Sequence, residues 1–580
     1  MKEENQGKTR NKVLSVFFKL IIIAIFLCGI LFVLKIAPNY IKTEITDKTN
    51  LVINYTNVTG KTKQDMIIDN NGVIYLSMDD IKNYYDKHIY YDKQYNQIVT
   101  SSETKLAVLE IGKNEITING EKSKIKGCAK LENNIYYLPI SEMEKVYNIK
   151  ISNLENTIVI ESLDNKLKVA KVNKKTAVKY KTTYFSKNIE KVAENDKLVI
   201  AEVTENTLPT GWVKVRTQNG KIGYIEEKYL KDIKEERKEK VYKKQINGKI
   251  SLAWEYFSEY AKAPNNTGIK YDGVNVVSPS FFYLKLENTE KENLTKSDVE
   301  TQATILENVG NEGTEYINWA KNNGYKIWPK VSNDTLATTI DEFSVIINDY
   351  ELRKKLIDDI LNYVEKYNLD GINLDFEYMY HTDKEAFSKF VIELAPQLRN
   401  KGVCLSVDVT APDGSENWSL CYNRHLIGEI ADYIVYMGYD QYGTNTIGTT
   451  SGFGWVERSI NKFLNQEEVP AEKIILALPF YTKLWKTKGE ETIGSSVVGI
   501  KNVNSKIPEN ATKEWKEDLQ QYYIQYEQNG YTYKMWIEDN ESFSKKIELV
   551  NKYNLAGSAY WRKGFESESI WNVIKNSLNL

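Results

Sequence analysis

The sequence has few of the residues that build metal centres or disulfide frameworks. Its 580 residues include 4 cysteines and 3 histidines. The cysteines are widely spaced without a metal-ligand pattern, and one of them, Cys28, lies in an apolar segment. A histidine-based metal site is therefore not expected. We predict no metal and no cofactor, and we expect any hydrolysis to depend on carboxylates.

An excess of charge of one sign is also absent. The chain has 77 basic and 79 acidic residues, which gives a formal net charge of −2. This balance provides no overall field that would attract nucleic acid. The basic run between 231 and 244 is interleaved with glutamate, as is typical of a solvated linker. We therefore expect no nucleic-acid partner.

One long hydrophobic run lies near the N-terminus. Residues 20–34 form an unbroken apolar run of 15 residues. This length fits either the core of a signal peptide or, with its flanks, a membrane span. Signal-peptide cleavage after Ala37 would require a small residue at position 35, and that residue is Lys35. We therefore favour an uncleaved transmembrane signal-anchor over 13–36.

The basic residues beside this run predict its orientation. Two basic residues, Lys42 and Lys48, follow Ile36 closely, and a larger number precede the run. The positive-inside rule then predicts a cytoplasmic tail over 1–12 and an extracellular position for the rest of the chain. We expect a single-pass protein of the cell membrane, with its large C-terminal part on the cell-wall side. The basic residues on the N-terminal side are Lys2, Lys8, Arg10, Lys12 and Lys19.

Residues 52–163 contain an internal repeat. The segment 74–77 reappears as 136–139, and each copy predicts a strand, a short helix and two further strands. This pattern resembles the copper amine oxidase N-terminal-like domain of bacterial surface proteins. Because His88 is the only histidine in the region, we expect a stalk or wall-contacting spacer and no copper site.

Short alternating strands are predicted over 166–232. Two strand-like segments flank Asn219-Gly220, a dipeptide typical of a hairpin turn. The pattern Gly-Trp-x-x-Val followed by Gly-x-x-Gly-Tyr-Ile resembles a bacterial Src-homology-3-like barrel, a module often found on wall-directed hydrolases. We assign no site to this region, and we predict a charged linker over 233–245.

The remaining residues, 246–580, alternate strand-like runs with helical segments. Such alternation predicts a parallel sheet, and eight strands predict a closed (β/α)8 barrel of the α/β class, preceded by small β-rich modules and the transmembrane helix. Residues 486–555 are too long for a normal crossover and predict a small α+β insertion. The predicted strands are 250–254, 274–278, 325–331, 371–377, 403–409, 433–437, 474–479 and 557–561.

The fourth predicted strand carries a row of polar residues. Asn373, Asp375 and Glu377 are spaced two apart, so their side chains share one face while the apolar residues between them take the other. A polar row is costly to bury in a dry core. In a barrel, Glu377 falls at the C-terminal end of its strand, where barrel enzymes place their sites. A carboxylic acid beside a carboxylate is typical of glycosidase chemistry.

The barrel region resembles glycoside hydrolase family 18, the chitinase and endo-N-acetylglucosaminidase group. Besides the acidic motif, 436–440 resembles the family's sixth-strand Met-x-Tyr-Asp, 478–481 the seventh strand, and Tyr560-Trp561 the eighth-strand tryptophan. The segments 535–539 and 553–557 are most similar to the branch with spore-cortex and peptidoglycan N-acetylglucosaminidases.

This resemblance implies substrate-assisted catalysis with retention of configuration. Glu377 would protonate the glycosidic oxygen and then activate water. Asp375 would accept the N–H of the substrate's 2-acetamido group and balance the positive oxazolinium. Tyr439 would hold the acetamido oxygen, and Trp561 would form a hydrophobic floor under the sugar.

Four positions are expected to bind substrate: Asn373, Trp561, Met437 and Asp440. For Asp440, orienting Tyr439 and capping a helix are alternatives. At position 373 many family members carry Asp, which shares a proton with the next carboxylate. We expect Asn373 to donate a hydrogen bond to Asp375 instead. For five further aromatic residues, lining a subsite and packing are equally favoured: Trp254, Tyr256, Tyr378, Tyr481 and Trp485.

The sequence therefore predicts a membrane-anchored glycosidase with an extracellular catalytic barrel. Its expected substrate is peptidoglycan, cleaved at β-1,4 linkages next to N-acetylglucosamine, because the anchor and the two wall-type modules keep the barrel near the cell's own wall. One alternative is a chitinase or endo-N-acetylglucosaminidase acting on another N-acetylglucosamine polymer. A second is a non-catalytic glycan-binding wall protein, which the retention of Glu377 disfavours.

Overall fold

The computed structural model divides into two compact units. The first comprises residues 1–91, 96–100 and 107–243, and the second comprises 92–95, 101–106 and 244–580. The structure describes residues 2–36, 49–154, 156–201, 210–240, 246–257, 270–286, 299, 303–333, 338–443, 446–509 and 511–580. Parts of two predicted segments, 202–209 and 241–245, lie outside the described residues, as do Lys42 and Lys48.

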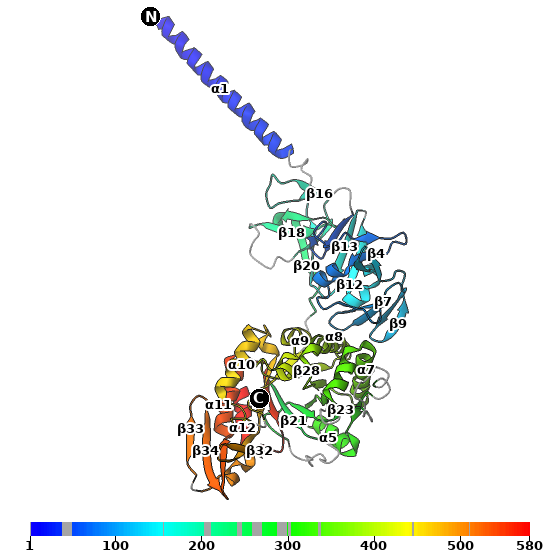
Figure 1. The fold of residues 1–580 in the computed structure, drawn as a ribbon. Helices are drawn as coiled ribbons and strands as arrows, with labels where there is room; N and C mark the ends of the chain where they lie inside the picture. Colours follow the sequence, from blue (N-terminus) through cyan, green and yellow to red (C-terminus); the bar gives the residue numbers. More distant parts are fainter. Residues whose placement is uncertain are drawn as a thin grey trace. The chain divides into compact units, whose positions relative to one another are not determined.

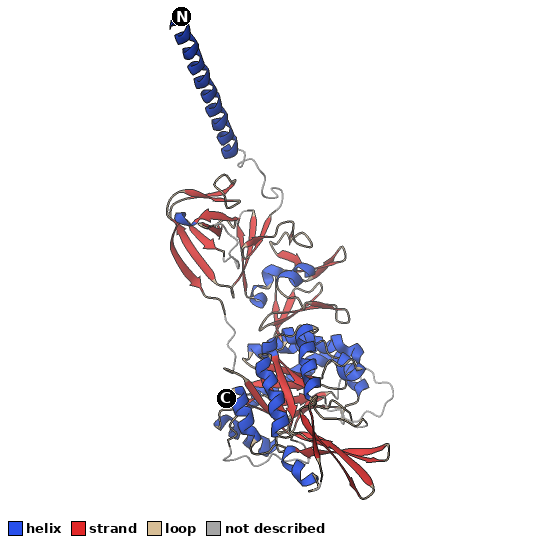
Figure 2. Ribbon diagram, turned by 90° about the vertical axis from the view of Figure 1, so that its left-hand side faces the viewer, coloured by secondary structure: helices blue, strands red, loops and turns tan. Residues whose placement is uncertain are grey.

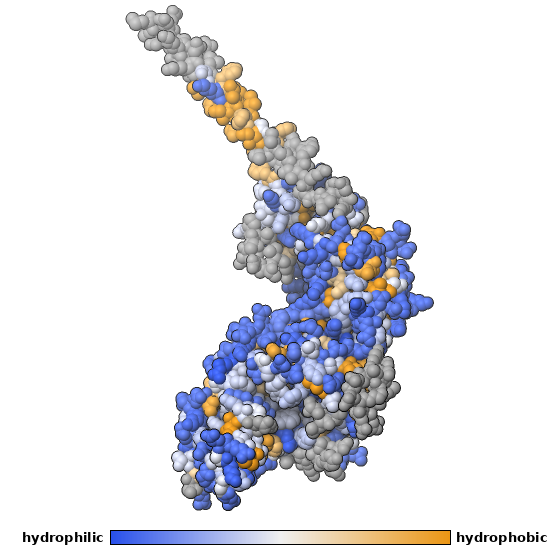
Figure 3. All heavy atoms as spheres, in the orientation of Figure 1, coloured by the Kyte–Doolittle hydropathy of each residue, from blue (hydrophilic) through white to orange (hydrophobic). Residues whose placement is uncertain are grey.

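The predicted hydrophobic run forms one helix, α1 (Lys2–Ile36). Its stretch Ser15–Phe32 has a mean hydropathy of 2.7, and none of that stretch is buried. Figure 3 shows this stretch in orange. The helix is long and apolar enough to cross a membrane, a property that signal sequences share.

Both copies of the internal repeat fold as the sequence predicts. In the first copy β4 is followed by α2, β5 and β6, and in the second β11 is followed by α3, β12 and β13. The equivalent strands β4 and β11 pair antiparallel, with Leu76 opposite Leu138, and both side chains are fully buried. The first copy comprises Ile74–Ser77, Met78–Tyr84, Tyr90–Asp92 and Gln97–Ser101. The second comprises Ile135–Leu138, Glu144–Tyr147, Ile149–Leu154 and Thr157–Ser162.

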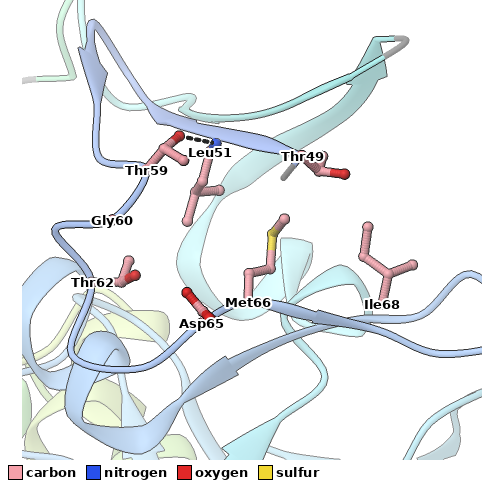
Figure 4. Close-up of a pocket in the computed structure, with 8 residues that line it drawn as sticks. All are labelled: Thr49, Leu51, Thr59, Gly60, Thr62, Asp65, Met66 and Ile68. Atoms are coloured by element: carbon pink, nitrogen blue, oxygen red, sulfur yellow. Dashed lines mark hydrogen bonds between the residues drawn. The ribbon is translucent and has the colours of Figure 1, made fainter. Parts of the chain in front are cut away.

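These strands belong to three small sheets with the orders β12-β13-β1-β2, β10-β11-β4-β3 and β5-β6-β7-β8-β9. The further strands are β1 (Asn50–Ile53), β2 (Thr56–Asn57), β3 (Ile67–Ile68), β7 (Leu106–Glu110), β8 (Glu115–Ile118), β9 (Glu121–Lys124) and β10 (Lys130–Glu132). A cavity of about 340 Å³ lies beside β1 and β3 (Figure 4). Among the described residues that line it, Asp65 is the one with an ionisable side chain.

Seven strands follow in one antiparallel sheet of order β16-β15-β19-β18-β17-β14-β20. Strands β18 and β19 form the predicted hairpin, and Gly220 has the positive φ, 78°, that such a turn requires. The resemblance to a Src-homology-3-like barrel stays a prediction. The strands are β14 (Leu167–Val172), β15 (Thr176–Lys179), β16 (Asn188–Val192), β17 (Lys197–Ile200), β18 (Trp212–Arg216), β19 (Ile222–Glu226) and β20 (Leu230–Arg237).

The start of the predicted linker differs from the expectation. Strand β20 continues through 233–237 and pairs with β14, with Lys168 opposite Glu235. Its side chains are largely exposed, as the charged composition indicated. The backbone nevertheless pairs, because long charged side chains are tolerated on an edge strand.

The second unit contains a closed barrel of eight parallel strand positions. Its sheet has the order β24-β23-β26-β27-β28-β29-β30-β36-β21-β22-β25. The third predicted strand is interrupted between β25 and β26 at Trp328-Pro329, because proline cannot donate a ladder hydrogen bond. The strands are β21 (Ile250–Glu255), β22 (Val276–Pro279), β23 (Phe282–Lys285), β24 (Thr304–Glu307), β25 (Lys326–Ile327), β26 (Lys330–Ser332), β27 (Gly371–Asp375), β28 (Cys404–Val409), β29 (Tyr433–Met437), β30 (Ile474–Pro479) and β36 (Gly557–Trp561).

Helices surround these strands (Figures 1 and 2). The helix before the fourth strand, α7, begins where the side chain of Asp349 accepts from the amide of Leu352, and it ends at Asn368 in the left-handed conformation. The helices are α5 (Gly310–Asn322), α6 (Ile340–Asn348), α7 (Tyr350–Tyr367), α8 (Lys384–Asn400), α9 (Arg424–Ile430), α10 (Phe453–Asn465), α11 (Asn540–Lys552) and α12 (Ile570–Leu578).

The predicted insertion is a five-stranded antiparallel sheet with one 3-10 helix, Ile500–Lys506. It starts at Tyr481, directly after the seventh strand, and its last strand ends at Trp536. Helix α11 packs against β30 and α12, so it belongs to the barrel. Figure 1 shows the sheet in orange. Its strands are β31 (Tyr481–Lys488), β32 (Glu491–Gly499), β33 (Lys513–Lys516), β34 (Gln521–Gln528) and β35 (Tyr531–Trp536).

Candidate active site

The acidic motif begins with two residues that build the strand. Asp370 accepts from the Lys326 ammonium at 2.7 Å and from the backbone N–H of Ile327 at 3.1 Å, so it joins neighbouring strands. Gly371 has no room for a side chain, because a Cβ atom there would lie 2.3 Å from Cδ1 of the buried Trp328. These two residues set the position of the polar row that follows.

The polar row lies as the two-residue period predicts. Asn373 is fully buried inside the barrel, Asp375 is 6% exposed, and Glu377 follows directly at the barrel mouth. Asp375 and Glu377 line one cavity of about 180 Å³. The intervening apolar side chains, which are buried in the layer toward the helices, are Ile372, Leu374 and Phe376. The full lining of the cavity is Trp254, Lys330, Asp375, Glu377, Asp408, Trp418, Met437, Tyr439, Asp440 and Trp561.

Asn373 is buried below this cavity and forms hydrogen bonds with several neighbouring side chains. Its amide nitrogen donates to Asp408 Oδ1 at 2.6 Å and to Ser406 Oγ at 3.1 Å. Its oxygen accepts from Trp254 Nε1 at 2.7 Å and from Ser278 Oγ at 3.4 Å. The expected hydrogen bond from Asn373 to Asp375 is not formed, because the amide hydrogens are directed to β28.

Asp375 is held by a lysine instead. Its Oδ2 atom lies 2.7 Å from Nζ of Lys330, and the two side chains are 7% and 14% exposed. Its Oδ1 atom is buried and has no hydrogen-bond partner among the described residues. Burial alone would lower the pKa of Lys330, but the Asp375 carboxylate more than offsets this and raises it.

The backbone of Glu377 is fixed from the next strand. Its N–H donates to Asn333 Oδ1 at 3.0 Å, and Asn333 Nδ2 donates back to its carbonyl oxygen at 2.6 Å. Burial, and then the charge of Asp375, raise the pKa of the Glu377 carboxyl well above its ordinary value. Lys330 lowers this pKa, and a side-chain hydrogen bond with Asp375 adds to the rise. This carboxyl can therefore carry a proton at a pH where an exposed glutamate has lost it.

Asp408 is a third acid in the cavity. Burial, and then the neighbouring Asp375, raise its pKa well above the ordinary value, and the hydrogen bond from Asn373 opposes the rise. It lies on β28 two residues after Ser406, so both side chains take the inner face of the barrel. Asp408 is not among the residues predicted from the sequence, although Ser406-x-Asp408 repeats the two-residue polar spacing of the motif.

Tyr439 and Asp440 follow the sixth strand at the cavity's edge. Burial raises the pKa of Tyr439 well above its ordinary value, so its hydroxyl keeps its proton and can donate. Asp440 accepts from Tyr481 Oη at 2.7 Å and from Lys483 Nζ at 2.8 Å, and it caps no described helix. It orients Tyr481, whose ring packs edge-to-face against Tyr439 with centroids 6.4 Å apart.

Apolar side chains complete the cavity. Trp561 at the end of β36 lies edge-to-face with Trp254, with ring centroids 5.8 Å apart. Met437 at the end of β29 is 6% exposed. Trp418, which no sequence signal indicated, lies in a π-helical turn, Glu416–Leu420, and its ring centroid is 5.1 Å from that of Tyr378.

The five unassigned aromatic residues separate into groups. Trp254 lines the cavity. Trp485 is fully buried and donates to the carbonyl of Gly448, so it packs, and Tyr481 is buried beside Asp440. Tyr256 and Tyr378 are 40% and 56% exposed.

The cavity combines a proton donor, a negative charge and a floor of aromatic rings. A carboxyl with a raised pKa can act as a general acid, and a fixed carboxylate can stabilise a positive charge that develops beside it. Across the described part of the chain, no group of three or more histidine, cysteine, aspartate or glutamate side chains is arranged to hold a metal ion.

Comparison with known proteins identifies two regions. The model of glycosyl hydrolases family 18 matches residues 253–565, more than half of the chain. The copper amine oxidase N-terminal domain model matches residues 52–162, which contain the repeat.

Two curated relatives come from Bacillus subtilis. The uncharacterized glycosylase YvbX is 26% identical over 46% of this chain and 79% of its own length. The cortical fragment-lytic enzyme is 24% identical over 41% of this chain and 56% of its own length, so the match spans about half of that relative.

Two solved structures are also similar. A chitinase from Chromobacterium violaceum has a TM-score of 0.48 and 22% identity, covering 57% of this chain and 99% of its own. The Bacillus cereus spore cortex-lytic enzyme SleL has a TM-score of 0.46 and 20% identity, covering 58% and 76%. With the family match over 253–565, the barrel and its acidic cavity show that this chain belongs to glycosyl hydrolases family 18.

Proposed function

We propose that the chain is a membrane-anchored glycosidase that cleaves β-1,4 linkages next to N-acetylglucosamine in peptidoglycan, on the outer side of the cell membrane. The observation that carries this proposal is the pair formed by Glu377, whose pKa is raised, and Asp375, whose Oδ1 atom is buried without a partner among the described residues. A buried acceptor without a donor is costly, and a substrate N–H would satisfy it.

The positions of these groups support the reaction that membership of family 18 implies. Glu377 donates its proton to the glycosidic oxygen while the substrate's own acetamido oxygen attacks the anomeric carbon. Asp375 accepts the acetamido N–H and balances the positive charge of the cyclic intermediate. Tyr439 donates to the acetamido oxygen, and the sugar rests on Trp561. Glu377 then removes a proton from the attacking water, so the configuration is retained.

The segments that precede the barrel and the names of its relatives support the substrate class. An apolar N-terminal helix and a repeat of the copper amine oxidase N-terminal type precede it, and one relative is named as a cortical fragment-lytic enzyme. An enzyme tethered at the cell surface reaches its own wall. Other relatives are named as chitinases, so an N-acetylglucosamine polymer such as chitin is the second candidate.

The test uses the full chain, purified in detergent, with peptidoglycan and, separately, with chitin oligomers. Mass spectrometry identifies the new reducing ends, and the Glu377→Gln variant is the control. We expect wall fragments that end in N-acetylglucosamine, and none from the variant. Cleavage of chitin oligomers alone would contradict the wall substrate. Binding without cleavage of either polymer would favour a glycan receptor.

A further inference from the structure

A largely buried lysine in the catalytic cavity has no role in the reaction described so far. Lys330 is the first residue of β26, where it pairs with Asn373 of β27. The next residue, Val331, is fully buried in the layer toward the helices, so Lys330 points into the barrel. Its side chain is only 14% exposed, and an ammonium group is costly to bury unless it is paired.

The pairing of Lys330 distinguishes the two oxygens of Asp375. The ammonium lies 2.7 Å from Oδ2, whereas Oδ1 has no partner among the described residues. The same ammonium lies 5.6 Å from the ring centroid of Trp561, the proposed sugar floor. One oxygen is thus anchored inside the protein, and the other is left for the cavity.

Among the described side chains, Lys330 is the positive partner of Asp375, and the Glu377 carboxyl also forms a hydrogen bond with Asp375. Asn373, the neighbour expected to bond Asp375, gives both amide hydrogens to β28. Without Lys330, the Asp375 carboxylate would lose the partner that fixes Oδ2 and would lose its compensating charge. A carboxylate that must meet one N–H of a bound sugar performs poorly when its orientation is not fixed.

We propose that Lys330 is a positioning residue for the family 18 reaction: it anchors Asp375 through Oδ2, so that Oδ1 meets the 2-acetamido N–H of the substrate. An acid at position 373 would hold the next carboxylate by sharing a proton with it. In this chain the fixed ammonium of Lys330 holds Asp375 instead. The inference rests on the acetamido-directed chemistry of the proposed function and not on peptidoglycan as the substrate.

Lys330 also acts on the proton affinity of the cavity. The acids that face it come from three strands or the residues after them: Asp375 at the end of β27 and Glu377 just after it, Asp408 from β28, and Asp440 after β29. Tyr439 adds a hydroxyl, Lys483 adds a positive charge that is bonded to Asp440, and Trp254 and Trp561 are uncharged. Removing one positive charge from this cluster makes the acids hold their protons more tightly. The pH–rate profile should therefore move to higher pH.

The experiment compares the full-length wild type with Lys330→Met, Lys330→Gln and Lys330→Arg on a soluble chromogenic N-acetylglucosamine oligosaccharide. Methionine removes charge and donor, glutamine removes the charge alone, and arginine keeps both. We expect kcat to fall by about a hundredfold for Met and Gln, with a smaller change in KM. We also expect their pH profiles to shift upward by about one unit, and Arg to keep the wild-type profile.

Lys563→Met is the matched control, because Lys563 is also a buried barrel lysine, paired with Glu255 at 2.7 Å, but it does not line the cavity. It should lose stability without a shift of the pH profile. A wild-type rate and profile in Lys330→Gln would overturn the proposal, and so would the same profile shift in Lys563→Met.

Binding provides a readout that does not need turnover. In the Glu377→Gln background, isothermal titration with N,N′,N″-triacetylchitotriose should show about tenfold weaker binding when Lys330→Gln is added. Unchanged affinity would contradict the positioning role. Failure of the wild type to cleave peptidoglycan would instead count against the wall substrate alone, since both measurements use soluble oligosaccharides.

Discussion

Two buried groups of charges in the same barrel are arranged in opposite ways. Between helices α7 and α8, Arg353 donates through Nε to both oxygens of Glu393 at 3.1 Å, and through Nη2 to one of them at 2.7 Å. Its Nη1 atom donates to the carbonyl of Ile347. In the cavity, by contrast, Asp375 keeps one buried oxygen without a partner among the described residues.

This difference distinguishes an ion pair that stabilises the fold from a site that can take part in a reaction. Arg353 and Glu393 satisfy each other's hydrogen bonds. This pair therefore stabilises the fold and offers no unsatisfied group to a ligand. The cavity leaves an acceptor unsatisfied and raises the pKa of Glu377, which costs stability and is typical of a functional site. Burial of charge occurs in both places, and only the completeness of the pairing distinguishes them.

The largest effect is expected from Glu377→Gln. Amide replaces carboxyl at nearly constant shape, so the variant cannot protonate the glycosidic oxygen, and kcat should fall by about 10³-fold or more. Initial rates on a soluble N-acetylglucosamine oligosaccharide measure this. Glu385→Gln, at an exposed position in α8, serves as the control and should retain the wild-type rate. An active Glu377→Gln enzyme would remove the assigned acid from the mechanism.

Glu393→Gln is expected to lower the stability and to leave the turnover rate nearly unchanged. This change leaves Arg353 buried without its counter-charge, so the free energy of unfolding should fall by about 3–5 kcal/mol. The rate per folded molecule should stay within about twofold, because the pair does not line the cavity. Denaturant unfolding and active-site-normalised rates test both halves. A selective loss of turnover with normal stability would invalidate the comparison.

The smallest effect is a dependence of stability on pH. An acid whose pKa is raised by folding is protonated more readily in the folded state than in the unfolded state. The folded state therefore loses stability as the pH rises above the unfolded value of 4.5 and until the folded pKa of Glu377 is passed. The Glu377→Gln variant lacks this penalty. Across that pH range its free energy of unfolding should therefore rise relative to that of the wild type, by about 1 kcal/mol or more. A constant difference in unfolding free energy between pH 4 and 8 would contradict the raised pKa.

The sequence predicts the parts of this site that follow from local periodicity. Two-residue spacing places Asp375 and Glu377 on one face of a strand, and the alternation of strands and helices places that strand fourth in a barrel. The Asp-Gly start of the motif is explained only by the structure, because the constraint on Gly371 comes from Trp328 on another strand.

The missed features depend on contacts between strands. A single lysine after Trp328-Pro329 gives no periodic signal. The register places Lys330 beside Asn373 on the neighbouring strand, and its long side chain reaches Asp375 two residues further on. The predicted hydrogen bond from Asn373 to Asp375 is wrong, because the amide of Asn373 donates to Asp408 across the strand pair. The register of neighbouring strands decides which polar groups contact each other. The periodicity along one strand carries no information about that register.

The most direct test of the mechanism is the anomeric form of the first product. The full chain in detergent is mixed with an N-acetylglucosamine oligomer, and proton NMR spectra are recorded before mutarotation. Because the substrate's acetamido group attacks one face and water then attacks the other, the account predicts that the β-anomer appears first and the α-anomer only later. An α-anomer that appears first would show direct inversion by water and would contradict the roles given to Asp375 and Glu377.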